Sequence, residues 1–192
     1  MATERILANL ERVDIITGET TPKLITGTTA NEATIEPEIN EGTREALRSK
    51  NRILAQNNFE DLVIGYNVTL RELQFSPEQF AVFDGGTYTP EQEGDGYTYT
   101  GPSMGAVVNR TPVTLDLWCS EKDGDGEALC YHRFRLKNTR GTPVSFTHTD
   151  GAFYAPEYTL RSRPKLGEAP IEIKQFDALP DADATAAELL EM

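Results

Sequence analysis

The sequence predicts a mainly β protein, a sandwich or barrel with one short α-helix and a long extended arm. Runs in which apolar and polar residues alternate with a period of two recur along the chain, separated by Gly, Pro and Asp turn residues. Only one internal stretch has the start and stop signals of a helix. The 192 residues, 38% of them hydrophobic, suffice for one core. We therefore expect a single domain over residues 1–178, followed by an acidic C-terminal tail over 179–192.

The N-terminal part reads as a hairpin followed by a third strand. Val13–Thr17 and Leu24–Thr28 are rich in β-branched residues, and Gly18 and Pro22 stand between them. Thr34–Ile39 is again typical of a strand. These runs predict a hairpin with a loose loop and a strand that leaves it.

Residues 39–59 are charged, weakly periodic and without turn residues after Gly42, so we expect a long arm that leaves the fold. Loops longer than about 12–15 residues in a compact domain are usually functional or disordered. Ile53 and Leu54 would need an apolar surface to pack on, which favours docking onto another subunit. The candidate contact residues are Glu41, Arg44, Glu45, Arg48, Lys50, Arg52, Ile53 and Leu54.

The stretch from Asp61 to Gly86 predicts a long strand that passes into a short helix. The strand has one apolar face, formed by Leu62, Ile64, Tyr66, Val68 and Leu70. The opposite face is polar and contains Gly65, Asn67, Thr69 and Arg71. Ser76 is a typical N-cap, Pro77 suits the first helical position, and Gly85 suits the helix end.

Residues 87–111 read as an exposed connection with short strand pieces. Its tip is acidic, because it contains Glu91, Glu93 and Asp95. Tyr88, Tyr97 and Tyr99 leave a second interpretation open, because tyrosines can stack on sugar rings. In that interpretation the chain is a free-standing carbohydrate-binding module.

Pro112–Glu121 and Glu127–Asn138 form the clearest predicted hairpin, joined by the Asp-Gly turn chemistry of KDGDG. Cys119 and Cys130 lie symmetrically about this turn and are interpreted as buried thiols, with a disulfide formed after release from the cell as the open alternative. On the face opposite Cys130, a basic stripe of Arg133, Arg135 and Lys137 is a candidate contact with acids of a neighbouring subunit. Two cysteines alone do not make a zinc site.

The last third predicts two further strands around Asp150-Gly151, over Val144–Thr149 and Phe153–Arg163, and a final strand over Ile171–Phe176. Pro180 then ends the sheet. The tail could form a short helix capped by Asp181 or Asp183, although about ten residues are marginal without docking.

Charge and motif content exclude several classes of function. With 18 basic and 31 acidic residues, the formal charge is −13, which argues against a protein that grips nucleic acid by its phosphates. No Gly-rich phosphate loop is present, no nucleophile is paired with a base, and His132 reads as a core or interface histidine. The sequence predicts no enzyme, no cofactor, no metal, no signal peptide and no membrane span.

Four stretches occur in the order found in one known family. They are EGTREALRSKNRILA, EDLVIGYNVTLRELQFSPEQFAVFDGGT, YTGPSMG and DGAFYAPEYTLRSRPKLGEAPIEI. Together they resemble the major tail tube proteins of long-tailed bacteriophages over most of residues 35–178. The same fold serves contractile tails, tailocins and secretion-system tubes.

The resemblance implies a β-sandwich whose copies close into hexameric rings that stack into a hollow tube in the virion tail, assembled in the host cytoplasm. It implies homo-oligomeric contacts, contacts with tape-measure and tail terminator or distal tail proteins, and passage of DNA without specific binding. It carries over no catalytic residue. The charge of −13 fits this expectation, because a negative wall repels the DNA polyanion, and we predict a net negative channel. Glu91, Glu93 and Asp95 are candidate residues of the channel wall, with the outer surface of the tube as the alternative position.

Overall fold

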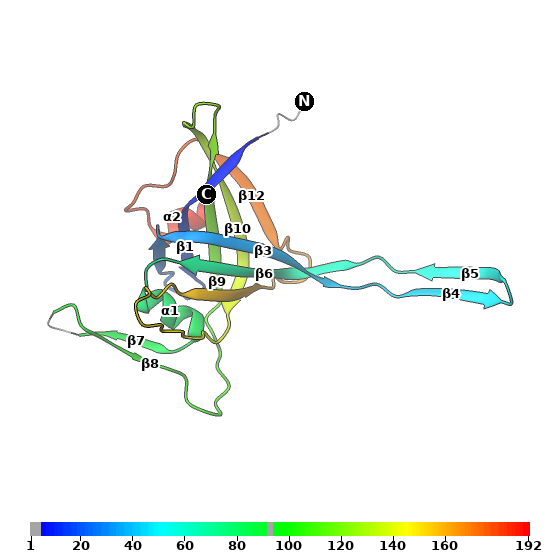
Figure 1. The fold of residues 1–192 in the computed structure, drawn as a ribbon, viewed down its shortest axis with the longest axis horizontal. Coiled ribbons are helices and arrows are strands. Elements are labelled where there is room, and N and C mark those ends of the chain that lie inside the picture. The colour runs from blue at the N-terminus through cyan, green and yellow to red at the C-terminus, as the bar shows by residue number, and fades with distance from the viewer. Residues whose placement is uncertain (1–4, 92–93) are drawn as a thin grey trace.

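A computed structural model describes residues 5–91 and 94–192, and within them eight strands form one antiparallel sheet (Figure 1). The strand order is β2-β1-β9-β10-β11-β6-β3, and β12 pairs with β10 beside this path. The strands of the sheet are β1 (Leu7–Thr17), β2 (Leu24–Gly27), β3 (Ala30–Asn40), β6 (Leu62–Glu72), β9 (Val113–Lys122), β10 (Ala128–Gly141), β11 (Glu157–Ser162) and β12 (Ile171–Phe176).

Two hairpins stand apart from this sheet: β4 (Arg44–Ser49) with β5 (Arg52–Asn58), and β7 (Thr87–Pro90) with β8 (Tyr97–Thr100). The helices are α1 (Pro77–Asp84) and α2 (Ala186–Glu191). The mainly β prediction is confirmed. In the described part of the chain, no helix is long and apolar enough to cross a membrane.

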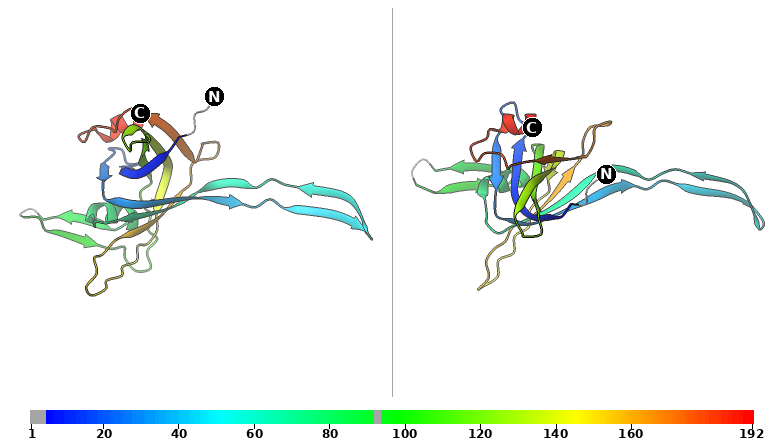
Figure 2. Two further views of the ribbon diagram at one scale, coloured as in Figure 1. Left: turned by 45° about the horizontal axis from the view of Figure 1, so that its top comes forward. Right: turned by 90° about the horizontal axis from the view of Figure 1, so that it is seen from above.

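Strand β10 joins two layers of the fold. Its first part pairs with β9 and β12, whereas its last residues pair with β11. The register shifts between Leu136 and Thr139, where Asn138 has a positive φ of 49°. The layer of β3 and β6 consequently crosses the layer of β1, β9 and β10, as Figures 1 and 2 show. The core fills the space between these layers.

The core consists of the inward-facing residues of both layers and the two phenylalanines of α1. Val68, Leu115, Leu136, Tyr158 and Leu160 are fully buried in it. Because alternate residues of a strand face opposite sides, each strand contributes every second residue to this core. Large apolar side chains therefore meet from segments as distant in sequence as β6 and β11.

Helix α1 begins and ends as its sequence predicts. The Ser76 hydroxyl accepts from the backbone N–H of Gln79, Pro77 opens the helix, and Gly85 adopts a left-handed conformation with φ 84°. Phe80 and Phe83 are each 1% exposed and hold the helix on the sheet. The helix covers the end of the core next to β7 and β8.

The structure corrects two predictions for the C-terminal third. Val144–Thr149 is not a strand, because β11 pairs with β10 and β6 instead, and Phe146 packs against Phe80 with ring centroids 5.0 Å apart. The tail does contain a helix, α2, but its N-cap is Thr185 rather than Asp181 or Asp183. Thr185 and Glu188 form a reciprocal capping box.

Candidate assembly surfaces

The predicted arm is a two-stranded ribbon that continues strands β3 and β6 beyond the body (Figures 1 and 2). The last β3–β6 pair is Asn40 with Leu62, and the pairing resumes at Arg44 with Asn58. We call residues 44–58 the arm. At its base, Gly42 lies so close to Phe59 that an added Cβ would be 1.9 Å from the Phe59 carbonyl oxygen. Only glycine fits at this crossing.

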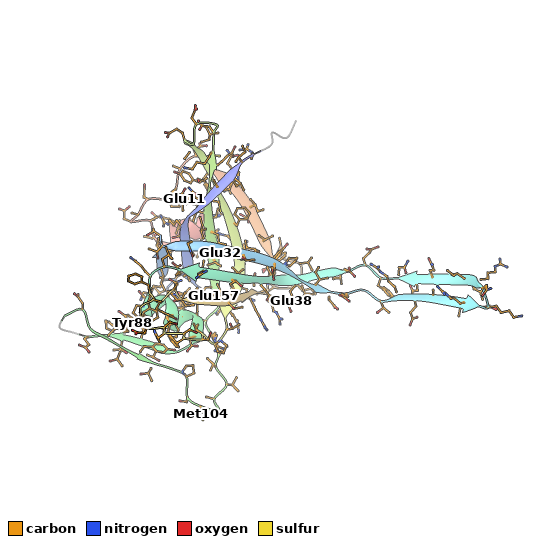
Figure 3. All side chains as sticks on the ribbon, viewed as in Figure 1. Glu11, Glu32, Glu38, Tyr88, Met104 and Glu157 are labelled. Atoms are coloured by element: carbon orange, nitrogen blue, oxygen red, sulfur yellow. The ribbon has the colours of Figure 1, made fainter. Side chains whose placement is uncertain are left out.

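Nothing in the described part of the chain covers the arm. Every residue of β4 and β5 is exposed, including Leu47 at 62%, Ile53 at 46% and Leu54 at 56%. Figure 3 shows the arm's side chains on both sides of the ribbon, with no other segment beside them. An isolated two-stranded hairpin is at best marginally stable in water, so the arm needs a partner surface.

The arm is basic in an otherwise acidic chain. It contains Arg44, Arg48, Lys50 and Arg52 against Glu45, a net charge of +3, which leaves −16 for the other residues. Glu41 lies at its base, together with Glu60 and Asp61. All eight predicted arm residues are exposed, and no ion pair involves them in the part of the chain that the structure describes.

The base of the arm exposes further apolar surface. Tyr66, Val68 and Leu70 pack into the core as predicted, but Leu62 and Ile64 are 62% and 46% exposed. The prediction that the apolar face of this strand is buried is therefore wrong for Leu62 and Ile64, because the part of β6 that precedes Gly65 lies outside the sandwich. The cross-strand partners Ile39 and Val63, at 49% and 51%, expose apolar surface on the opposite face of the ribbon.

The polar face predicted for β6 extends across four strands. Arg140, Arg161, Asn67 and Glu36 are cross-strand neighbours in one row, and Glu157, Arg71 and Glu32 in another. A threonine row, Thr159, Thr69 and Thr34, lies between them. Arg163 bonds Glu38 at 2.7 Å beside these rows. The charges on this face balance, so the excess of −13 lies elsewhere.

A surface pocket of about 620 Å³ adjoins this face and contains four arginines, Arg110, Arg140, Arg161 and Arg163. Arg140 and Arg161 are direct cross-strand partners. Like charges directly opposite each other destabilise a sheet. Arg163 is paired with Glu38, whereas the other three arginines of the pocket have no ion pair among the described residues.

Hairpin β7–β8 projects from the side of the body opposite the arm (Figure 1). Glu91 and Asp95 are exposed near its tip, and Glu93 lies outside the described residues. Tyr88 and Tyr97 have ring centroids 6.0 Å apart. Tyr99 instead packs edge-on against Phe80 and donates its hydroxyl to Asp84, so only two of the three tyrosines are free for a ligand.

The predicted basic stripe is largely inside the subunit. Arg133 is 0% and Arg135 4% exposed, whereas the Lys137 side chain is 49% exposed and lies 4.0 Å from Glu172. Arg135 donates two hydrogen bonds to Asp116, at 2.8 and 2.7 Å, and further ones to the carbonyls of Leu189 and Leu190 in α2. Of the three, only Lys137 is available to a neighbouring subunit.

A second arginine ties down the start of the tail. Arg12 bonds Asp14 at 2.8 Å and the Pro180 carbonyl at 2.9 Å, and Asp14 also accepts from the Trp118 indole at 2.9 Å. Burial raises the pKa of Asp116, although Arg135 opposes the shift. Sequence reasoning missed this cluster, although Asp14 and Asp116 inside apolar strands were a usable signal.

Among the described residues, Glu121, Cys130 and His132 form a group of three side chains able to ligate a metal. The hydrogen bond from His132, followed by those from Cys130 and Arg5, lowers the pKa of Glu121 to about 2. Both cysteines are free thiols, as the sequence suggested. The group lies at the hairpin end of β9 and β10.

No family model and no curated protein sequence matches this chain. Several chains of solved structures resemble it at low sequence identity, and three of them are described here. A chain of the sheath–tube complex of an extracellular contractile injection system, PVC, is 15% identical with a TM-score of 0.42, covering 86% of this chain and 90% of that one.

The other two belong to the anti-feeding prophage. A chain of its baseplate is 11% identical, covering 91% of this chain and 97% of that one, and a chain of its tube-terminating cap is 12% identical, covering 91% and 94%. Both have a TM-score of 0.42. The function of this chain is therefore inferred from its own geometry.

Proposed function

We propose that this chain is a structural subunit of a phage-tail-like tube, whose copies form hexameric rings that stack around a channel for DNA. The observation that carries the proposal is the arm, a basic ribbon with exposed leucine and isoleucine side chains. It packs on no other segment in the described part of its own chain. The hexameric number, the virion tail and the contacts with tape-measure and terminator proteins come from the sequence resemblance.

The charge distribution supports docking between copies. The arm carries +3 and the other residues −16, so the arm of one copy is attracted to the body of the next. The arm and the β7–β8 hairpin, whose tip is acidic, project from opposite sides of the body (Figure 1). Such a head-to-tail contact is heterologous, and repeated contacts of this kind generate rings or filaments.

The sheet edges support the same assembly. Strands β2 and β3 end the order of strands, and β12 has only β10 as a neighbour among the described residues. Unpaired strand edges recruit other chains unless they are covered. In a closed ring, each edge can be covered by the neighbouring copy.

The polar face of β3, β6 and β11 is our candidate channel wall. Its arginines and glutamates balance, so a negative channel requires additional acids such as Glu91, Glu93 and Asp95. The prediction of a net negative channel stays a prediction, and a positive potential measured in an assembled tube would contradict it.

The decisive experiment replaces Glu41–Asp61 with Asn-Gly. Asn40 pairs with Leu62, so a two-residue turn closes the β3–β6 hairpin in its own register. The removed segment has equal numbers of acidic and basic residues, so the net charge stays at −13. Negative-stain microscopy should show rings or tubes for the native chain and folded monomers for the variant.

Tubes from the variant would show that the arm is dispensable and would remove the main support for this function. A chain that stays monomeric at every concentration would do the same. The alternative, a carbohydrate-binding module, predicts a monomer whose mobility shifts with sugar and loses this shift in Tyr97→Ala. Only Tyr88 and Tyr97 remain available for that role.

A further inference from the structure

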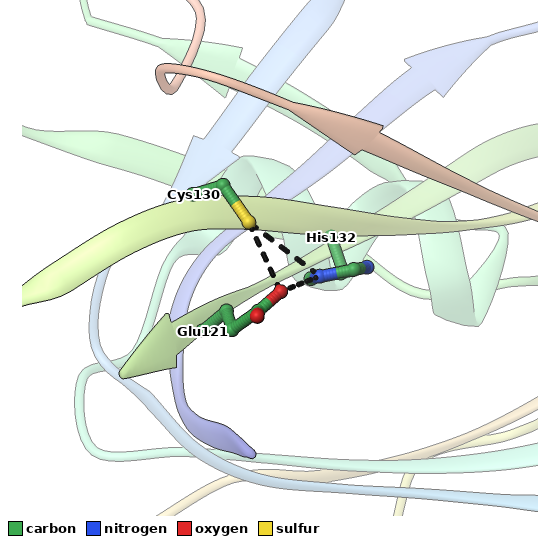
Figure 4. A group of neighbouring side chains, drawn as sticks. All are labelled: Glu121, Cys130 and His132. Atoms are coloured by element: carbon green, nitrogen blue, oxygen red, sulfur yellow. Dashed lines mark hydrogen bonds and ion pairs between the residues drawn. The ribbon is translucent and has the colours of Figure 1, made fainter. Parts of the chain in front are cut away.

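We infer that Glu121, Cys130 and His132 form a zinc site with one position open to solvent, at the end of the β9–β10 hairpin (Figure 4). Cys130 and His132 are two residues apart on β10 and therefore share a face, and Glu121 is the direct cross-strand partner of Cys130. The sheet itself thus brings together a thiol, an imidazole and a carboxylate from two adjacent strands.

The spacing of the three donor atoms suits an ion of this size. Cys130 Sγ is 3.7 Å from His132 Nε2 and 3.1 Å from Glu121 Oε2, and Nε2 is 2.8 Å from Oε2. Bonds of about 2.3 Å to sulfur and about 2.0 Å to nitrogen and oxygen at tetrahedral angles separate such atoms by roughly 3.3–3.6 Å. Zinc therefore requires the carboxylate oxygen to move outward by only about half an ångström.

The donor set selects the metal. Thiolate and imidazole favour zinc over magnesium or calcium, which prefer oxygen ligands. Each of the three residues is at most 8% exposed, so an ion bound between them is shielded from solvent on most sides. On binding, the Cys130 S–H bond breaks as a Zn–S bond forms, and that proton leaves to solvent. The neutral His132 ring gives up its Nε2 hydrogen as a Zn–N bond forms and takes up a proton at Nδ1, so one proton is released per ion.

Without metal, protons occupy the position of the ion. The Cys130 thiol, His132 Nε2 and Arg5 Nη1 all bond the same atom, Glu121 Oε2, with Arg5 at 2.6 Å. The Arg5 side chain is 41% exposed and can leave without opening the core. Its positive charge opposes a cation, so Arg5 limits the affinity of the site.

The test uses tag-free, reduced full-length protein and cobalt(II) as a spectroscopic probe for zinc. The chain has two cysteines and two histidines, so the thiol ligand and the imidazole ligand each have a second residue of the same type as a control. We expect one cobalt per chain with a sulfur-to-cobalt charge-transfer band that zinc abolishes. Cys130→Ser should lose the band, whereas Cys119→Ser and His148→Gln should keep it.

Two further variants extend the test. Arg5→Gln should bind cobalt about 10-fold more tightly, a typical size for a change next to the ligands. Glu121→Gln removes a ligand and should weaken cobalt binding by more than the roughly 10–100-fold that is typical for residues next to the ligands. This variant tests the site if circular dichroism shows that Cys130→Ser does not fold. Zinc at a hundredfold excess over Kd should raise Tm by about 5–10 °C.

Absence of the charge-transfer band in the native chain, or its loss in Cys119→Ser instead of Cys130→Ser, would overturn the site. A band that persists in a folded Glu121→Gln with unchanged affinity would overturn the three-ligand arrangement. The measurement works on monomers and assemblies alike, so its result is independent of the proposed tube.

Discussion

Two regions of the molecule contain several arginines: the face of β1, β9 and β10 that α2 covers, and the β4–β5 arm. Only on the covered face do the arginines have hydrogen-bonding and ion-pair partners. Arg12 and Arg135 bond Asp14, Asp116 and the carbonyls of the tail, and these arginines are at most 6% exposed. Arg44, Arg48 and Arg52 of the arm are exposed and have no ion pair among the described residues. Charges that are matched within one copy stabilise the fold, and unmatched ones are left for another molecule.

The largest effect is expected where a matched pair is broken. Asp116→Asn leaves the Arg135 guanidinium buried without its counter-charge and should lower the free energy of unfolding by about 3–5 kcal/mol. Urea denaturation measures this. Asp125→Asn, an exposed change in the same hairpin, should stay within about 0.5 kcal/mol. A loss below about 1 kcal/mol for Asp116→Asn would contradict the assigned pairing.

The next largest effect is expected in helix α2, which covers the buried Arg135. Leu189 of α2 is 0% exposed and packs against Ile16 and Ala186, whereas the adjacent Leu190 is 41% exposed. Leu189→Ala should cost about 2–4 kcal/mol in thermal or urea unfolding, because it opens a cavity above the arginines. Leu190→Ala is the matched control and should cost far less. Equal losses would mean that α2 is not docked in solution.

Acid should lower the free energy of unfolding through protonation of the Glu121 carboxylate in β9. Its pKa falls from 4.5 in the unfolded chain to about 2 in the fold, first because of the hydrogen bond from His132. This contribution to stability is therefore present above pH 4.5 and disappears as the pH falls toward 2. The pH dependence of unfolding in this window should be shallower in Glu121→Gln. Glu127→Gln, an exposed acid of the same hairpin, controls for net charge, and an equal reduction there would contradict this assignment.

The smallest effect on stability, and the sharpest on assembly, is expected in the arm. Arg48→Glu should change the free energy of unfolding by less than about 0.5 kcal/mol, because the side chain touches little of its own chain. It should nevertheless weaken assembly in sedimentation experiments, as should raised salt for the native chain. Lys165→Glu makes the same charge change on an exposed loop away from the arm. Equal weakening by both variants would point to net charge instead of docking.

Elements set by local chemistry could be predicted from the sequence. The Ser76-Pro77 start and Gly85 end of α1 and the Asp-Gly turn between β9 and β10 depend on neighbours within a few residues. The departure of the arm was also predictable, since its charged and weakly periodic sequence has no face suited to a core. Its hairpin pairing was not predicted.

Alternation alone could not tell which faces would be covered. The period of two correctly separated Arg133 and Arg135 from Phe134 and Leu136, but it assigned the arginines to the surface. For Leu62 and Ile64 the prediction was wrong in the opposite sense: the period of two assigned them to a buried face, but they are exposed. Their strand extends beyond the layer that would have buried them.

The sequence by itself determined the eight strands of the main sheet, the capped helix α1, the turn chemistry and the segment that leaves the body, because these follow from short-range propensity and periodicity. The tertiary structure decided which charges are enclosed and which ligands meet. Arg135 is enclosed by Leu189, 54 positions away, and Glu121 meets Cys130 only through strand register. Such long-range contacts depend on the free energy of packing the whole chain, which no local pattern contains.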